Sequence, residues 1–263
     1  MRALSDLHTH SSFSFDAEYA PIRMVEGAVK RGLREFCLTD HLDFDRPMTE
    51  WNIPDFAARE GQLSVLDRAF PGLRIGRGAE VSMAGRDCAR RAEELLSGLE
   101  LDFVIGSVHT IRGANVWEDA FYEGWSRRDI YRIYLEQIIR SLECFPTLDV
   151  LGHYDFVAHY APYADRSFFY EDAPDLFDEI FRWLLVHGKT LEINSSSWEG
   201  DSPWGLDILC RFREMGGHFV TLGSDAHNPG RVGDRLEEAA ALAEAAGLAV
   251  VTYHGHRPQP LQP

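Results

Sequence analysis

The chain contains few cysteines and no pattern that would pair them. Cys37, Cys88, Cys144 and Cys210 are widely separated, and no two have the spacing of a zinc ribbon or a redox pair. We therefore expect free thiols in a reducing compartment. No apolar run is long enough to span a bilayer, and the N-terminus lacks the apolar core of a secretory signal. These absences predict a soluble, cytoplasmic protein.

Basic residues are scarce relative to acidic ones. The 263 residues include 26 Lys and Arg against 42 Asp and Glu, a formal net charge of −16. Such a chain is a poor binder of nucleic acid polymers and anionic membranes. Part of the acidity can be local, because carboxylates that hold divalent cations are counted without their metals. Without linkers or repeats, and with 45% hydrophobic residues, the chain is expected to form one domain over residues 1–263.

Apolar strand patterns alternate with amphipathic helix patterns along the whole chain. After a first strand that ends near residue 6, strands are expected at 36–39, 73–79, 102–108, 148–152, 190–194 and 218–223. Helices are expected at 21–32, 54–70, 88–96, 126–144, 172–186, 204–215 and 235–246. Alternation predicts parallel strands with crossover helices, and seven such units predict a closed α/β barrel. We expect an extended tail at 249–253 and a fraying, proline-rich end from residue 257.

Metal-ligand side chains follow or end most of these strands. The first strand leads into Asp6-Leu7-His8-Thr9-His10, whose spacing places Asp6, His8 and His10 on one face of an extended chain. The later strand ends carry His41, Glu80, His109, His153, Asp225 and His227. In a parallel barrel these ends share one face of the molecule.

This recurrence favours a metal site over a structural explanation. A single strand-end histidine is more often a buried core residue than a ligand. Six strand ends that bring imidazoles and carboxylates to one place would be costly without cations to pair them. The set contains no thiolate, which favours zinc, manganese or iron. It also has too many ligands for one ion, which indicates two or three divalent ions, with Glu80 as a bridging carboxylate.

Taken in order, these motifs resemble the PHP (polymerase and histidinol phosphatase) superfamily. The matching segments are Asp6-x-His8-x-His10, Thr39-Asp40-His41, Glu80, Gly106-Ser107-Val108-His109, Gly152-His153-x-Asp155 and Gly223-Ser224-Asp225-Ala226-His227. Within the superfamily the chain is most similar to the stand-alone histidinol-phosphate phosphatases. The resemblance implies a distorted (β/α)7 barrel with a trinuclear metal centre at the C-terminal ends of the strands.

The resemblance also implies residue roles. His8, His10, Glu80 and Asp225 would hold the first ion, Glu80, His109 and His153 the second, and Asp16, His41 and His227 the third. Asp16 stands where some relatives have histidine, and it could instead cap the helix that begins at Pro21. Asp40 and Asp155 would orient imidazoles, with proton transfer as a second role for Asp40. The expected catalytic residues are Asp40, Glu80 and His227.

The implied reaction is hydrolysis of a small phosphate monoester, with L-histidinol phosphate as the leading substrate. A metal-generated hydroxide would attack phosphorus while the ions take up the developing charge. The alternatives are another small phosphate ester, such as a nucleotide, and a non-catalytic metal-binding regulatory module. A partner of nucleic acid polymer or membrane is not expected, and the oligomeric state is left open.

Two departures from the family pattern affect the substrate. Basic residues usually follow the Gly-His-x-Asp motif, but this chain has Phe156-Val157-Ala158-His159. Glu199 stands where the branch often has arginine. Fewer fixed cations weaken recognition of a dianionic phosphate, so we expect His159, Arg166 or Arg231 to contribute to substrate binding. Glu199 could pair with a substrate amine.

Aromatic residues are frequent in the loops that follow the strands. Examples are Phe15, Trp117, Tyr160 and Trp204. They either pack the loops together or form a lid that stacks on a flat leaving group, and the sequence does not separate these alternatives.

Overall fold

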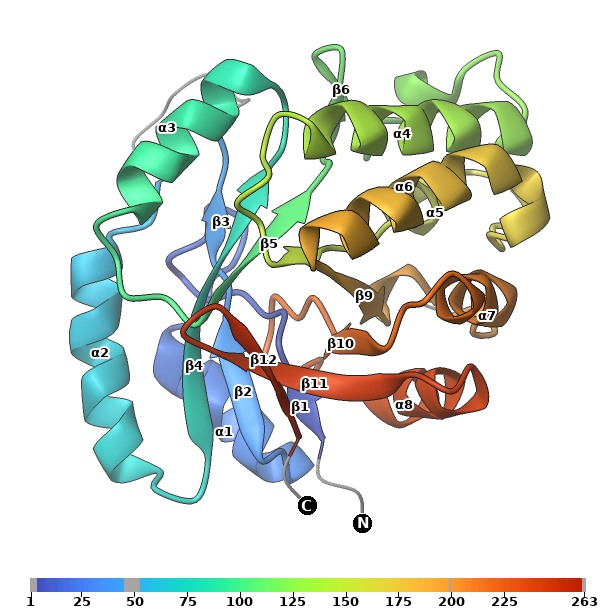
Figure 1. The fold of residues 1–263 in the computed structure, drawn as a ribbon. Coiled ribbons are helices and arrows are strands. Elements are labelled where there is room, and N and C mark those ends of the chain that lie inside the picture. The colour runs from blue at the N-terminus through green and yellow to red at the C-terminus, as the bar shows by residue number, and fades with distance from the viewer. Residues whose placement is uncertain (1–3, 45–52, 199, 262–263) are drawn as a thin grey trace.

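A parallel barrel surrounded by helices forms the core of the protein (Figure 1). The computed structural model describes residues 4–44, 53–198 and 200–261. The barrel wall consists of β1 (Ser5–Asp6), β2 (Glu35–Leu38), β4 (Arg74–Ser82), β5 (Phe103–Ser107), β8 (Val150–Leu151), β9 (Thr190–Asn194) and β10 (Phe219–Gly223), in that spatial order. Neighbouring wall strands pair in parallel, as the alternating pattern predicts. A short strand, β3 (His41–Leu42), continues beyond β2 and also pairs with β4.

Helices cover the outside of the wall. They are α1 (Pro21–Arg31), α2 (Phe56–Ala69), α3 (Arg86–Leu96), α4 (Arg127–Leu142), α5 (Phe156–Tyr160), α6 (Pro174–His187), α7 (Leu206–Glu214) and α8 (Leu236–Ala245). Local signals set several ends: α1 begins at a proline and ends before Gly32, whose φ of 75° suits glycine. None of the described helices is long and apolar enough to cross a membrane.

The loops contain short elements that the sequence patterns do not predict. An antiparallel pair, β6 (Thr110–Ile111) and β7 (Ala114–Asn115), follows β5, and the short helix η2 (Asp119–Tyr122) comes after it. The aromatic segment after β8 contains α5 and then η3 (Tyr170–Asp172), and η4 (Ser196–Trp198) follows β9. Each is too short for a periodic signal.

The barrel closes through irregular backbone and not through a regular ladder. The amide of Leu7 donates to Leu222 O at 2.9 Å, the amide of Asp225 donates to His8 O at 2.8 Å, and the amide of His10 donates to Ala226 O at 2.9 Å. These bonds join the chain after β1 to the chain after β10. The two segments that carry His8, His10, Asp225 and His227 are therefore held side by side.

A C-terminal hairpin closes the other end of the barrel, where fraying was expected. β11 (Ala249–His254) pairs in parallel with β10, and β12 (Arg257–Pro260) pairs antiparallel with β11. The expected fraying is therefore wrong for residues 257–260. Gly255 and His256 connect the strands with φ values of 54° and 62°, as a two-residue type I′ turn requires. Prolines at alternate positions suit an edge strand, where every second N–H points away from the partner.

Side chains of β11 fill the barrel interior. Val251 and Tyr253 are buried in one apolar cluster with Leu7, Cys37, Phe103, Ile105 and Val150 from four strand segments of the wall. The hydroxyl of Tyr253 lies 2.6 Å from Thr190 Oγ1 and 3.3 Å from Asp149 O, at the N-terminal ends of β9 and β8. The metal-ligand residues lie at the opposite ends of the same strands.

We expect Tyr253→Ala to lower the free energy of unfolding by about 3–5 kcal/mol, because it leaves a cavity among closely packed residues. Tyr253→Phe keeps the ring and removes only the hydrogen bonds, so its cost is expected near 1 kcal/mol. Urea unfolding of both variants measures the difference. Equal losses for the two variants would show that the ring does not fill the barrel.

Candidate metal centre

The predicted ligands gather at the C-terminal ends of the barrel strands. His8 and His10 follow β1, His41 begins β3, Glu80 lies within β4, His109 follows β5, and His153 follows β8. Asp225 and His227 follow β10, and Asp16 comes from the loop before α1. The imidazoles of the first five histidines in this set, and the carboxylate of Glu80, are almost completely buried. Asp16 and His227 are partly exposed, with side-chain exposures of 38% and 31%.

The Glu80 carboxylate lies at the middle of this cluster. Its Oε1 is 3.3 Å from His8 Nε2, 3.3 Å from His109 Nε2 and 2.8 Å from His153 Nε2. Its Oε2 is 2.8 Å from His41 Nδ1 and 3.6 Å from His10 Nε2. One carboxylate therefore contacts imidazoles from five places in the sequence, as a bridging ligand would.

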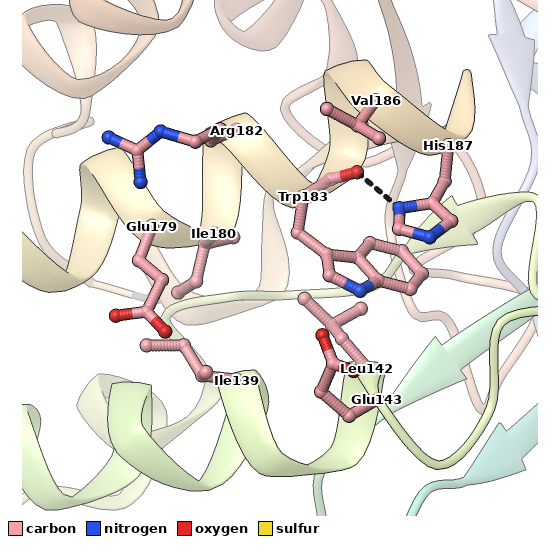
Figure 2. A pocket seen from close by; sticks show the side chains of 9 residues that line it. All are labelled: Ile139, Leu142, Glu143, Glu179, Ile180, Arg182, Trp183, Val186 and His187. Atoms are coloured by element: carbon pink, nitrogen blue, oxygen red, sulfur yellow. Dashed lines mark hydrogen bonds between the residues drawn. The ribbon is translucent and has the colours of Figure 1, made fainter.

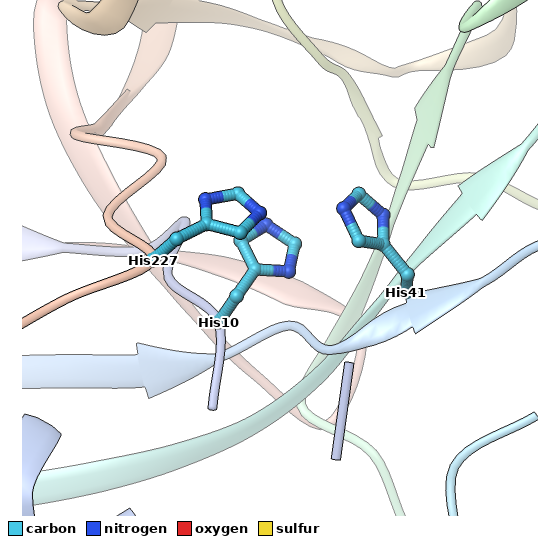
Figure 3. Close-up of side chains that lie close together, drawn as sticks. All are labelled: His10, His41 and His227. Atoms are coloured by element: carbon cyan, nitrogen blue, oxygen red, sulfur yellow. The ribbon is translucent and has the colours of Figure 1, made fainter. Parts of the chain in front are cut away.

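Two further groups of ligand atoms adjoin Glu80. Asp225 Oδ1 lies 3.1 Å from His10 Nε2 and 3.6 Å from His8 Nε2. The Oδ2 atom of Asp16 lies 3.5 Å from His41 Nε2 and 3.4 Å from His227 Nε2. The rings of His10, His41 and His227 come from three segments and face one another (Figure 3), with His10 centred 4.2 Å from each of the other two.

The donor atoms fit a metal centre. His8 Nε2, His10 Nε2, Glu80 Oε2 and Asp225 Oδ1 are buried and have no hydrogen-bond partner among the described residues. A buried polar atom without a partner costs free energy, which a bound cation would offset. The triads His8–Glu80–His153, His8–His10–Asp225 and His10–His41–His227 each bring three ligand atoms within 4.8 Å of one another. These residues are nitrogen and oxygen donors of the kind that zinc and similar ions bind.

Second ring nitrogens hold several imidazoles in position. His8 Nδ1 lies 2.8 Å from Glu192 Oε1, His10 Nδ1 lies 3.0 Å from Ser14 Oγ, and His227 Nδ1 lies 2.9 Å from the carbonyl oxygen of Asp225. A proton on each Nδ1 leaves the Nε2 lone pair directed at the centre, the usual arrangement around metal-bound histidine. Glu192 was placed on the sixth strand by the sequence, but its contact with His8 was not predicted.

Asp43 is a second residue that the sequence analysis missed. Its carboxylate is buried, and its Oδ2 lies 3.7 Å from His109 Nδ1. The His41–Asp43 spacing of two residues after β2 is a signal that could have found it, because alternate residues of a strand share a face. His41, Asp43 and His109 form a fourth group of closely spaced ligand atoms.

Three predicted acidic residues lie behind the centre. The expected convergence of Asp6 with His8 and His10 is wrong: Asp6 accepts hydrogen bonds from Ser224 N at 3.0 Å and Gly233 N at 2.7 Å, and so fastens β1 to the chain after β10. Asp155 accepts from Trp204 Nε1 at 2.8 Å and from Ser197 Oγ at 3.2 Å. Asp40 accepts from Ser11, Ser14 and Arg59, outside the cavity lining.

Burial and neighbouring charges set the protonation of the ligands. Burial, followed by the positive charges of His41 and His227, lowers the pKa of His10 to about 4. Burial opposes ionisation of Glu80, yet the histidines around it hold the pKa of its carboxyl well below the usual value. His10 is therefore neutral and Glu80 ionised near neutral pH, the forms that bind metal.

The cluster opens into a cavity of about 410 Å³. Its lining combines ligands with aromatic side chains: Phe15, Asp16, His41, His109, Trp117, Phe156, Tyr160, Asp225 and His227. Phe15, Trp117 and Tyr160 were among the loop aromatics of the sequence analysis, and Phe156 was not. No lysine or arginine of the described residues lines the cavity.

Three of the predicted substrate-binding residues, His159, Arg166 and Arg231, are not part of this lining. Arg166 donates to Asp201 Oδ2 at 2.8 Å and to His159 O at 2.7 Å. Arg231 lies 3.1 Å from Asp234 Oδ2, and His159 Nδ1 contacts Ser196 O at 2.9 Å. Glu199 lies outside the described residues. The substrate-binding role of these four residues stays a prediction.

A second hollow lies on the outer surface between α4 and α6 (Figure 2). It holds about 220 Å³ and is lined mainly by apolar groups, with Trp183 at its centre and Glu143 and Glu179 at its edges. His187 Nδ1 contacts Trp183 O at 2.8 Å in this region. None of the predicted site residues lines it, so it is not the metal site.

The fold and the site define a class of protein: an α/β barrel that carries, at its strand ends, a cluster of histidines and carboxylates suited to metal binding. The family model of the PHP domain matches residues 6–196, and the chain belongs to this family.

Similar proteins come from Lactococcus lactis and Listeria monocytogenes. A curated histidinol-phosphatase of Lactococcus lactis is 30% identical, over 95% of this chain and 94% of that protein. A crystal structure of the Lactococcus lactis histidinol phosphate phosphatase, in complex with zinc, L-histidinol and phosphate, matches with a TM-score of 0.88 at 29% identity, over 97% of this chain and 98% of that one. A Listeria monocytogenes structure, 18% identical over 89% of this chain and 99% of that one, has a TM-score of 0.71 and supports the fold.

We expect Glu192→Gln to weaken metal binding about 10- to 100-fold. Glu192 accepts from His8 on one oxygen, and from His153 N and Asn194 Nδ2 on the other. The NH2 of a glutamine would face a donor whichever way it turned. Zinc retained against a competing chelator measures the effect, with the exposed Glu214→Gln as the matched control. Equal retention in both variants would contradict this role of Glu192.

Proposed function

We propose that this chain is a metal-dependent phosphatase that hydrolyses L-histidinol phosphate to L-histidinol and phosphate. The observation that carries the proposal is the buried cluster of histidines and carboxylates around Glu80, open to a cavity with aromatic walls. The name and ligands of the 30% identical Lactococcus lactis protein support the same reaction and substrate.

The contacts support three neighbouring ion positions, of which the first two share Glu80. The first would use His8, His10, Glu80 and Asp225, the second Glu80, His109 and His153, and the third Asp16, His41 and His227. Divalent ions bound there would supply an activated water and would neutralise charge on the phosphoryl oxygens. Zinc, manganese and iron all suit this donor set.

Several residues of the chain would position the ions and the substrate. Glu80 contacts a predicted ligand of each proposed position, so it would link the ions bound there. His227 lines the cavity beside Asp16 and is the proposed catalytic residue nearest to solvent. Phe156 and the other aromatic walls offer flat surfaces for the imidazole ring of the leaving alcohol, L-histidinol. The contacts of Asp40 favour an orienting role over proton transfer.

A second candidate substrate class follows from the cavity lining. No lysine or arginine of the described residues lines the cavity, so none of these residues selects one phosphate monoester over another by its charge. Another small phosphate ester, including a nucleotide, is therefore the alternative to histidinol phosphate.

Phosphate release from L-histidinol phosphate tests the proposal directly. We expect turnover of this substrate to exceed that of a panel of nucleotide and sugar phosphates by orders of magnitude, and Glu80→Ala to abolish it. Slow, equal hydrolysis of the whole panel would keep the phosphatase and reject the substrate. Absence of any turnover by protein with its metals bound would reject the phosphatase.

Removal of the metals is expected to abolish phosphate binding as well as catalysis. The cavity lining offers no described lysine or arginine to hold a phosphate, so the ions must provide the positive charge. Isothermal titration calorimetry of inorganic phosphate with the metal-free and the zinc-loaded protein measures phosphate binding in each form. Comparable binding by the metal-free protein would point to a fixed cation at the site.

Arg166→Ala distinguishes a structural arginine from a substrate-binding one. Because Arg166 is paired with Asp201, we expect KM to change less than about threefold while stability falls. Loss of a charged hydrogen bond to phosphate would instead cost about 1.5–3 kcal/mol, or a tenfold or larger rise in KM. Steady-state kinetics and thermal unfolding of the variant separate these outcomes.

A further inference from the structure

The hydrogen bonds behind His10 form a chain that starts on an outer helix. Arg59 of α2 contacts Asp40, Asp40 contacts Ser14, and Ser14 contacts His10. We propose that Asp40 and Ser14 are positioning residues that fix the tautomer of His10, so that its Nε2 presents a lone pair to the metal centre, and that Arg59 sets which atom of residue 40 faces Ser14. The inference rests on the proposed function only in taking His10 as a metal ligand.

Arg59 is a buried cation that fixes the hydrogen-bonding direction at Asp40. Its side chain is 2% exposed, its Nη1 donates to Asp40 Oδ2 at 3.1 Å, and its Nη2 donates to Gly78 O at 2.8 Å. A guanidinium can only donate. The other carboxylate oxygen, Asp40 Oδ1, accepts from the backbone amide of Ser11 at 2.7 Å, and that group is also an obligate donor. Both oxygens of Asp40 are therefore acceptors.

Because both oxygens of Asp40 accept, the Ser14 hydroxyl can only donate to Asp40. Ser14 Oγ lies 3.1 Å from Asp40 Oδ1, and its single hydrogen is donated to that oxygen. The same Oγ accepts from the backbone amide of His41 at 3.0 Å. His10 Nδ1, 3.0 Å from Oγ, must then bring its own proton.

The proton on Nδ1 determines the state of the other ring nitrogen of His10, Nε2. With the proton on Nδ1, His10 Nε2 carries a lone pair, and it faces Asp225 Oδ1 at 3.1 Å and Glu80 Oε2 at 3.6 Å. A lone pair opposite two carboxylates is unfavourable unless a cation lies between them. The relay therefore prepares a metal-binding nitrogen.

The Nδ1 partner of His10 differs from the Nδ1 partners of two neighbouring histidines. His8 donates directly to the Glu192 carboxylate, and His227 to the carbonyl oxygen of Asp225, and these oxygens are pure acceptors. The partner of His10 is a hydroxyl, which can donate or accept. On the Nδ1 side of the ring, the groups behind Ser14 therefore decide whether the hydroxyl accepts from His10 or donates to it.

Asp40→Asn tests the direction of the relay. Arg59 would hold the amide oxygen, so the NH2 group would face Ser14 and turn its hydroxyl hydrogen toward His10 Nδ1. We expect this variant to bind zinc about 10- to 100-fold more weakly than the native protein. Arg59→Met alone leaves Asp40 as an acceptor and should lower thermal stability with little change in zinc binding.

The double variant gives the sharpest result. Without Arg59, the amide of Asp40→Asn can turn its oxygen back toward Ser11 and Ser14. We therefore expect Arg59→Met to restore part of the zinc affinity lost in Asp40→Asn, although the double variant is less stable. If Asp40 and Arg59 acted only on stability, the losses of zinc affinity in the two single variants would add in the double variant.

Competition with a chromogenic chelator measures zinc binding in the four proteins, with thermal unfolding followed in parallel. Asp149→Asn is the matched control, because Asp149 is a buried acceptor for Val104 N and His256 Nδ1 at the far end of the barrel. It should lose stability and keep its zinc affinity. If Asp40→Asn does not fold, Ser14→Ala replaces it, since loss of the acceptor should also weaken zinc binding.

Native zinc affinity in Asp40→Asn, or in Ser14→Ala, would overturn the relay, as would a double variant whose losses add. Phosphate release from L-histidinol phosphate is measured on the same samples. A native protein that binds zinc and shows no turnover would reject the proposed function, while the zinc affinities would still decide the relay.

Discussion

The contact that the rest of the site depends on is the convergence of imidazoles on the buried Glu80 carboxylate. Ionised carboxylate deep in a barrel is unfavourable unless positive charge or hydrogen bonds surround it. Here histidines from several strand ends lie within 2.8–3.6 Å of its two oxygens. The geometry places ligand atoms where divalent ions would share them. The buried negative charge of Glu80 is unfavourable in the metal-free protein, and the same charge would attract divalent cations.

Barrel closure is what brings the first and last ligands together. The segments after β1 and β10 are joined by backbone hydrogen bonds among Leu7, His8, His10 and their partners. Asp6 adds a side-chain connection to Ser224 and Gly233. At the far end, the β11–β12 hairpin fills the interior with Val251 and Tyr253. The packed interior and the predicted metal ligands thus lie at opposite ends of one set of strands.

Membership of the PHP family explains the ligands better than it explains the pocket. The histidines and carboxylates of the family motifs are present and gathered. By contrast, the described lining holds no arginine or lysine, and Arg166 pairs with Asp201. The walls are aromatic and acidic. A pocket of this kind leaves recognition of phosphate to the metal ions and recognition of the leaving group to stacking and shape.

Much of this protein is determined by its sequence alone. Alternating strand and helix patterns predict the barrel, and His8, His10, Glu80, His109, His153, Asp225 and His227 follow from their places near strand ends. Both are local signals, since periodicity and spacing act over a few residues. The resemblance of the motifs to one family then supplied Asp16 and the grouping of the ligands.

Only the tertiary structure decided the partners of these residues. The contacts of Glu192 with His8, of Arg59 with Asp40, and of Asp6 with Ser224 each join segments far apart in the chain. It also decided that residues 257–260 of the proline-rich end form a strand and that Arg166 pairs with Asp201. The physical reason is that a hydrogen bond depends on distance and direction in space, and the chain sets these only when the barrel closes.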